Sequence, residues 1–167
     1  GNFTYEPNVD GLRWFVAEVL PGVAAEVRLV VVGAGGVDAI GHDKNGRVHA
    51  TGGVADLEPY YREAAVVICP LRAGSGTRLK ILEAMGWARP VVSTTIGAAG
   101  LGLRDGRDLL IADEPRAFAA AIDSLVGDPV RADALGRAGR QVVLRAHTPA
   151  VTDAAVASLL QPWESRT

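Results

Sequence analysis

Residues 65–83 read A-V-V-I-C-P-L-R-A-G-S-G-T-R-L-K-I-L-E, and they indicate both the fold and a site. An apolar run, typical of a buried strand, leads through a glycine-rich turn into a helical pattern. Such a helix start exposes backbone N–H groups and carries the positive end of the helix dipole. Arg78 and Lys80 lie in this first turn, where acids are normally preferred, so we expect an anion there. Because Glu83 could accept hydroxyl donors one turn further on, the stretch predicts a pocket for a phosphorylated, hydroxyl-bearing ligand such as a nucleotide sugar.

Short β-branched runs alternate with helical patterns along the rest of the chain. The expected strands are Arg28–Val32, Arg47–Thr51, Ala65–Cys69, Pro90–Thr94 and Asp108–Ala112. The expected helices are Val9–Leu20, Leu57–Glu63, Thr77–Trp87, Pro115–Leu125, Val130–Ala146 and Ala150–Leu160. Three strands (LVVV, AVVIC and PVVS) are continuously apolar, as strands buried on both faces of a parallel sheet are. The alternation predicts one α/β domain over residues 1–167, with a Rossmann-like, doubly wound parallel sheet flanked by helices.

Composition narrows the function classes. The chain has 167 residues and a formal net charge of −2, so nothing points to a nucleic-acid partner. No apolar stretch approaches the ~20 residues of a spanning helix, and no signal-peptide pattern opens the chain, so we expect no transmembrane segment and a cytoplasmic protein. Asp105, Asp108 and Asp113 are interpreted as solvated turn residues, and the histidines lack metal-ligand spacing, so we expect no metal.

Glycines follow the expected strands in four clusters. They are Gly33–Gly36, Gly52–Gly53, Gly74–Gly76 and Gly97–Gly102. In doubly wound folds, ligands bind beyond the carboxyl ends of the strands, so these loops should converge on one cleft. Gly74 and Gly76 would let a phosphate approach the backbone closely, and Thr77 is expected as the N-cap of the helix. The alternative reading is a solvated helix with a Lys80–Glu83 ion pair.

The segment from Pro70 to Leu101, P-L-R-A-G-S-G-T-R-L-K-I-L-E-A-M-G-W-A-R-P-V-V-S-T-T-I-G-A-A-G-L, resembles the donor-binding motif of the retaining group 1 glycosyltransferases with GT-B architecture. It is most similar to a bacterial branch that reads G-S-G-T-R-L-K-I-L-E-A-M-A. Further agreement comes from Gly1–Asn8 (G-N-F-T-Y-E-P-N), Val30–Gly33 and Pro59-Tyr60-Tyr61, and the resemblance runs from Gly1 to about Ala146.

The resemblance implies that this chain is the C-terminal, donor-binding half of a GT-B enzyme. The N-terminal acceptor domain would be absent, the helix at about 150–161 could pack on that domain, and the full-length enzyme could contact a membrane peripherally. The donor would be a nucleotide-diphosphate sugar, with no cofactor, and the fragment alone would be inactive. The site residues implied are Gly53, Val54, Gly74, Ser75, Gly76, Thr77, Arg78, Lys80, Glu83, Gly97 and Gly100.

Within that set the resemblance implies separate roles. Glu83 would bind the ribose hydroxyls, with Glu83 and Arg78 supporting catalysis, and the residues from Gly76 to Arg78 would face the diphosphate and the sugar. Gly53 and Val54 would flank the base. The sequence departs from the family at Ser75, where many members carry a sugar-binding glutamate. The family's basic residues after the first strand are also not evident in Gly1–Asn8, so Arg78 and Lys80 are expected to carry the phosphate charge.

Three other interpretations of the function stay open. Gly33 and Gly35 begin a dinucleotide-binding pattern, G-x-G-x-x-G, but its third glycine position is Asp38. A nucleotide-sugar epimerase would share the architecture. A non-catalytic nucleotide-binding module would share the site.

Overall fold

The computed structural model describes residues 1–40, 46–74, 76 and 78–147. The expected helix at Ala150–Leu160 and two site residues, Ser75 and Thr77, lie outside this part of the chain. The strands are β1 (Leu29–Val32), β2 (Val48–Gly52), β3 (Val67–Cys69), β4 (Val91–Ser93) and β5 (Leu110–Ile111). The longer helices are α1 (Glu6–Trp14), α4 (Leu79–Gly86), α6 (Pro115–Val126) and α7 (Pro129–Ala146), and the shorter ones are α2 (Gly36–Ile40), α3 (Glu58–Glu63) and α5 (Thr95–Ala98).

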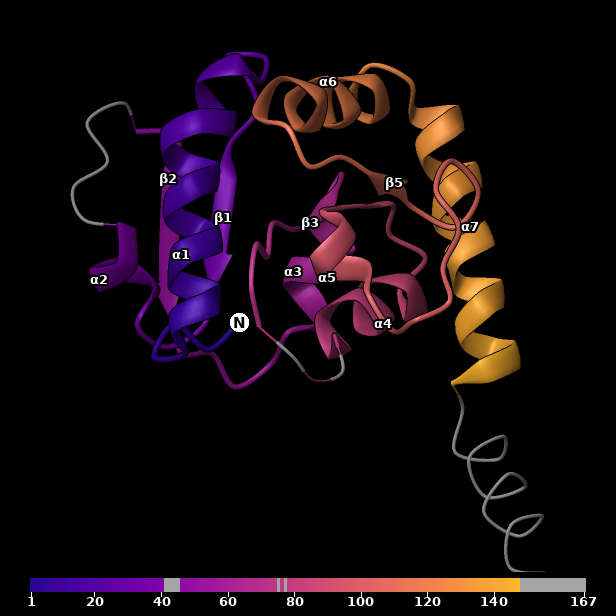
Figure 1. Cartoon of the computed structure of the whole chain (residues 1–167), viewed down its shortest axis with the longest axis horizontal. Helices are drawn as coiled ribbons and strands as arrows, with labels where there is room; N and C mark the ends of the chain where they lie inside the picture. The colour runs from indigo at the N-terminus through magenta and orange to yellow at the C-terminus, as the bar shows by residue number, and fades with distance from the viewer. Residues whose placement is uncertain (41–45, 75, 77, 148–167) are drawn as a thin grey trace, which may run out of the picture.

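All strand pairs are parallel, and helices flank them, as the alternating pattern predicted (Figure 1). The pairs fall into two sheets, β1–β2 and β3–β4–β5. β1 pairs with β2 through Val31 opposite Ala50, and β3 pairs with β4 through Cys69 opposite Ser93. The architecture is therefore a Rossmann-like α/β fold whose ladders are divided between two sheets.

The first sheet is covered by α1 and α2. Val9 and Leu12 of α1 pack with Val31 and Ala39 in a small core. Val30 points away from this core and is 49% exposed, so the expectation that this apolar strand is buried on both faces is wrong. In the neighbouring sheet every residue of β4 is buried, as expected, whereas β3 is fully buried only at Cys69 and half-buried at Val67 and Ile68.

The largest core joins the two sheets. α1 continues into a π-helical turn, η1 (Phe15–Val19), and a 3₁₀ turn, η2 (Leu20–Gly22). Phe118 of α6 is fully buried, and its ring meets those of Trp14 and Phe15 edge-on, at centroid distances of 5.7 and 5.9 Å. Val92 of β4 belongs to the same cluster. Aromatic packing from α1, η1 and α6 therefore couples the sheets, and no described strand bridges them.

α7 lies directly against α4. Gly136 and Gly139 face this contact, and a Cβ at Gly139 would lie 2.9 Å from Met85 Cγ and 3.1 Å from the Asp108 carbonyl oxygen. Glycine at this position lets the two helices approach closely. α7 therefore supports α4, the helix that carries the expected site.

Candidate functional site

The loop between β3 and α4 has the conformation that its glycines permit. Gly74 has φ +104° and Gly76 has φ +94°, values that side-chain-bearing residues rarely adopt. A Cβ at Gly74 would also lie 3.0 Å from Tyr5 Oη and 3.2 Å from Pro7, whereas one at Gly76 would meet no atom within 4 Å. Gly74 is therefore needed for packing as well as for the turn, and Gly76 faces open space.

α4 begins at Leu79, two residues after the expected start at Thr77. Arg78 takes the N-cap position with φ −85° and ψ 64°, and it is only 6% exposed. One guanidinium nitrogen, Nη2, donates to the Gly74 carbonyl oxygen at 2.9 Å and to that of Ile96 at 3.5 Å. The non-helical backbone turns this side chain inward, so Arg78 joins the glycine loop to α5.

Lys80 lies on α4 and reaches the N-terminal segment. Its Nζ donates to Asn8 Oδ1 at 2.8 Å, and Asn8 Nδ2 in turn donates to the Asn2 carbonyl oxygen at 2.7 Å. Burial lowers the pKa of Lys80 from its ordinary value, with the charge of Arg78 acting in the same direction. The two cations thus lie near each other, as the sequence predicted, but both are tied into the fold.

The carboxylate of Glu83 lines a cleft of about 570 Å³ between α3, α4 and α7. Tyr61 of α3 donates its hydroxyl to Glu83 Oε2 at 2.9 Å. The cleft is lined by Asp56, Leu57, Glu58, Tyr61, Glu83, Gly86, Trp87 and Arg140. The exposed Gly53 and the half-buried Val54 follow β2 and lead directly to this wall.

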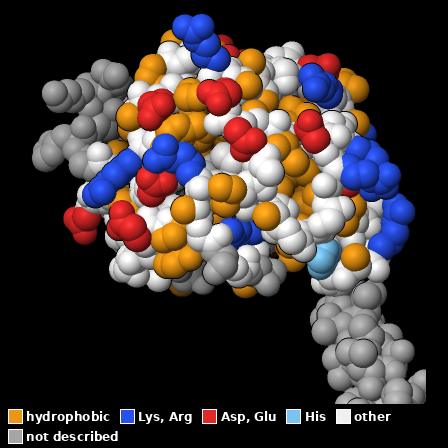
Figure 2. Space-filling view, in the orientation of Figure 1, with side chains coloured by type: hydrophobic (Ala, Val, Ile, Leu, Met, Phe, Trp, Pro, Cys, Tyr) orange, Lys and Arg blue, Asp and Glu red, His pale blue; other side chains and the backbone are white. Residues whose placement is uncertain are grey.

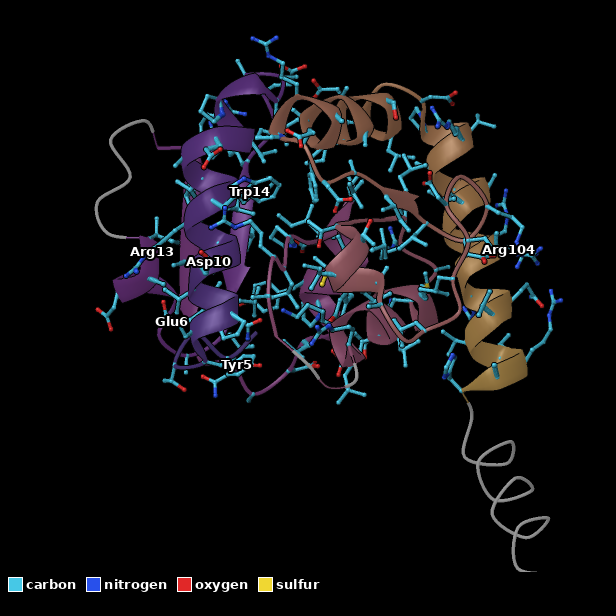
Figure 3. All side chains as sticks on the ribbon, in the orientation of Figure 1. Tyr5, Glu6, Asp10, Arg13, Trp14 and Arg104 are labelled. Carbon is cyan, nitrogen blue, oxygen red and sulfur yellow. The ribbon has the colours of Figure 1, made fainter. Side chains whose placement is uncertain are left out.

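Contacts join the glycine clusters in pairs. The Gly33 N–H donates to the Gly52 carbonyl oxygen at 2.9 Å. The N-terminal segment lies over the loop after β1, because the Phe3 N–H donates to the Ala34 carbonyl oxygen at 2.9 Å. The same segment reaches the β3–α4 loop through Tyr5, which Figure 3 shows near the start of α1. The N-terminal segment thus contacts the loops after β1 and β3, and Arg78 links the loop after β3 to α5. None of the four glycine clusters is among the residues that line the cleft at Glu83, so convergence of these loops on one cleft stays a prediction.

Gly97 and Gly100 have different surroundings. Gly97 is buried, its N–H donates to Thr94 Oγ1 at 2.9 Å, and a Cβ there would lie 2.6 Å from the Cys69 carbonyl oxygen. Close packing accounts for this glycine. Gly100 is exposed with φ +81° and has open space around its Cα.

One interpretation of the acidic loop residues needs correction. Asp108 is buried rather than solvated, and it accepts from the Arg104 N–H at 2.9 Å and from Arg107 Nε at 2.8 Å. Asp113 is exposed, as expected, and it accepts from the Thr95 N–H at 2.8 Å. These carboxylates order loops, and no group of three metal-ligating side chains occurs among the described residues.

Asn8 and Tyr61 are the site neighbours that the sequence did not single out. Both lie in segments that resemble the glycosyltransferase family, Gly1–Asn8 and Pro59-Tyr60-Tyr61. That overlap is the signal that could have indicated them. Their contacts to Lys80 and Glu83 depend on tertiary packing across 72 and 22 residues.

Basic side chains gather along the edge of the molecule formed by α7, whereas acidic and basic side chains are mixed on the face over α1 (Figure 2). Within the described ranges, no helix is both long enough and apolar enough to cross a bilayer.

Comparisons with known proteins place this chain in a family. The model of the family described as glycosyl transferases group 1 matches residues 1–128. A D-inositol 3-phosphate glycosyltransferase of Kineococcus radiotolerans is 40% identical over 98 residues, which are 52% of this chain and 22% of that relative. The chain spans 22% to 34% of the length of the curated relatives it matches.

Solved structures show the same fold at lower identity. HepE of Anabaena, solved in complex with UDP, is similar with a TM-score of 0.72 and 18% identity, over 92% of this chain and 44% of that one. The sucrose-phosphate synthase of Thermosynechococcus elongatus is similar with a TM-score of 0.75 and 22% identity, over 96% of this chain and 44% of that one. Because the family model covers most of the residues, this protein belongs to the group 1 glycosyltransferases.

Proposed function

We propose that this chain is the C-terminal, donor-binding half of a retaining GT-B glycosyltransferase and that it holds a nucleotide-diphosphate sugar at the start of α4. One observation carries the proposal: Glu83 borders a cleft one turn after Arg78 and Lys80, on a helix preceded by glycines of positive φ. Membership of the glycosyltransferase family supports a sugar donor, and so do the UDP and UDP-glucose held by HepE.

Each residue has a proposed role. Glu83 accepts hydrogen bonds from the ribose hydroxyls, and the N–H groups of the Gly74–Arg78 loop with the two cations face the diphosphate. Gly53 and Val54 flank the base, and the loop at Gly97–Gly100 closes the other side of the donor. In the reaction, the bond from the anomeric carbon to the diphosphate breaks and a bond to the acceptor oxygen forms. Donors already in place stabilise the negative charge that develops on the departing diphosphate.

The acceptor and its proton would be handled by an N-terminal acceptor domain of the full-length protein. We therefore expect the 167 residues to bind the donor without turnover. A cytoplasmic location, and a peripheral membrane contact of the full-length enzyme, belong to the same proposal. Measurable sugar transfer by this chain alone would contradict the assignment of donor and acceptor to separate domains. An epimerised donor without transfer would favour an epimerase.

Calorimetric titration with UDP, GDP, ADP and TDP, and with their sugars, tests donor binding. Replacing both Arg78 and Lys80 with alanine should abolish nucleotide binding. An unchanged affinity for the nucleotides would contradict the proposed diphosphate site. Glu83→Ala should weaken binding roughly 10- to 100-fold, because a hydrogen bond to a charged group contributes about 1.5–3 kcal/mol. Glu63→Ala, an exposed glutamate at the end of α3, is the matched control and should leave affinity unchanged.

Because Arg78 also holds the Gly74 carbonyl oxygen, each variant needs a thermal unfolding curve beside its titration. A double variant that folds as the wild type does, yet binds no nucleotide, has lost the site rather than the fold.

A further inference from the structure

The hydroxyl of Tyr61 contacts Glu83, the residue on which the proposed ribose site depends. The phenol donates to Oε2 at 2.9 Å and leaves Oε1 outside that bond. The ring itself is half-buried and packs against the core cluster that contains Ile81 and Met85 of α4. Tyr61 therefore has an anchored ring and a hydroxyl aimed at the exposed carboxylate.

α3 is held against α4 by contacts that do not involve this hydroxyl. The Arg62 guanidinium carbon lies 5.4 Å from the centroid of the Trp87 ring, a cation–π arrangement. Arg62 Nη2 also pairs with Glu58 Oε1 at 2.7 Å, which orients the guanidinium. Because these contacts and the packing of the Tyr61 ring fix the helix, the hydroxyl is not required to keep α3 in place.

The Tyr61 phenol keeps its proton at neutral pH. Burial, together with the neighbouring Glu83 carboxylate, holds the pKa of Tyr61 well above its ordinary value of 10.0. The hydroxyl can therefore act as the donor in its hydrogen bond to Glu83. A free glutamate side chain loses up to about 2 kcal/mol of rotamer entropy when it is fixed, and this hydrogen bond fixes it before a ligand arrives.

We infer that Tyr61 is a positioning residue that fixes the Glu83 carboxylate for the vicinal hydroxyls of the donor ribose; the inference rests on the proposed function. Tyr61 does not touch the nucleotide in this scheme. It holds Oε2 so that Oε1 meets the ribose in one orientation. Its contribution therefore concerns the ribose hydroxyls and not the base or the phosphates.

Tyr61→Phe tests the inference, since it removes one oxygen atom and keeps the buried ring. Binding of UDP and of 2′,3′-dideoxy-UDP is measured by calorimetry for the 167-residue chain, with the GDP and ADP pairs in parallel. The wild type should prefer each ribonucleotide by about tenfold or more. Tyr61→Phe should lower that preference by about three- to tenfold and leave the affinity for the dideoxy compound unchanged.

Two controls separate positioning from a structural role. Tyr60→Phe, at the adjacent position of α3, should leave the preference unchanged. In a Glu83→Ala background, adding Tyr61→Phe should have no further effect on binding. A Tyr61→Phe variant with the wild-type preference, or one that weakens both compounds equally, would overturn the inference alone. A wild type that binds none of the ribonucleotides would overturn the proposed function as well.

Discussion

Replacing Gly97 with alanine should destabilise the protein and displace α5, which contacts Arg78 of the candidate site. α5 crosses close to the ends of β3 and β4, and a new Cβ would lie 2.6 Å from the Cys69 carbonyl oxygen and 3.0 Å from Thr94 Oγ1. It would also overlap Ser93 Oγ, which is fully buried. The Cys69 carbonyl oxygen belongs to the backbone and cannot turn aside as a side chain could, so the backbone must move. Overpacking of this kind costs about 1–3 kcal/mol of the free energy of unfolding.

For a domain of this size, 1 kcal/mol shifts the unfolding midpoint by about 2–4 °C, so Gly97→Ala should lower it by roughly 2–12 °C. Gly53→Ala is the control, because its Cβ would meet no atom within 4 Å and its backbone is not in the left-handed region, so its effect should stay within about 0.5 kcal/mol. Calorimetric unfolding measures the midpoint of each variant. Since Ile96 accepts from Arg78, the displaced α5 should also weaken nucleotide binding. If Gly97→Ala and Gly53→Ala unfolded at the same midpoint temperature, the close approach of Gly97 to the Cys69 carbonyl oxygen would be refuted.

Three further predictions concern stability. Phe118→Ala should cost about 3–5 kcal/mol in urea unfolding, because it empties the centre of the largest core; a loss below about 1.5 kcal/mol would contradict that placement. Asp10→Asn should cost up to about 1 kcal/mol at pH 7, because Arg72 pairs with Asp10 through two hydrogen bonds, at 2.6 and 3.0 Å. Arg72 lowers the pKa of Asp10, so this stability is present above the ordinary value of 3.8 and is lost as pH falls through the lowered pKa; a difference that stays constant as pH falls below 3.8 would count against the pair. Burial lowers the pKa of Lys80, so just below pH 10.5 the unfolded chain binds more protons than the folded one, and the free energy of unfolding should rise with pH there. Lys80→Met should reduce this slope in urea unfolding measured from pH 8 to 10.5. A slope equal to that of the wild type would contradict the assignment to Lys80.

Elements with strong local signals were predicted closely from the sequence. α6 and α7 begin at Pro115 and Pro129, which favour the first turn of a helix, and each observed end lies within one residue of the predicted one. α1 begins three residues earlier than predicted, because Pro7 is also placed in a first turn. All five predicted strands were found; β2 has the predicted length but is shifted by one residue, and the other four are shorter than predicted.

Features that depend on distant parts of the chain were not predictable in this way. The late start of α4 follows from Arg78 turning inward toward carbonyl oxygens of the glycine loop and of α5. The exposure of Val30 follows from how the strands divide between sheets, which periodicity does not encode. For the candidate site, the residue types around Glu83 were identified from the motif. Their partners, Asn8 and Tyr61, come from packing between separate segments.

The division of the ladders between two sheets has a consequence for amide hydrogen exchange. Backbone hydrogen bonds couple β3, β4 and β5 to one another, and β1 to β2, but within the described residues no ladder runs between the two groups. Because side-chain packing, and no described ladder, joins the two sheets, we expect each sheet to have its own level of amide protection. The N-terminal segment contacts the loop after β1 through Phe3 and α4 through Asn8. A ligand that contacts both the loop after β1 and the start of α4 should raise the amide protection of the two sheets together. Hydrogen exchange would then give similar opening rates for the two sheets.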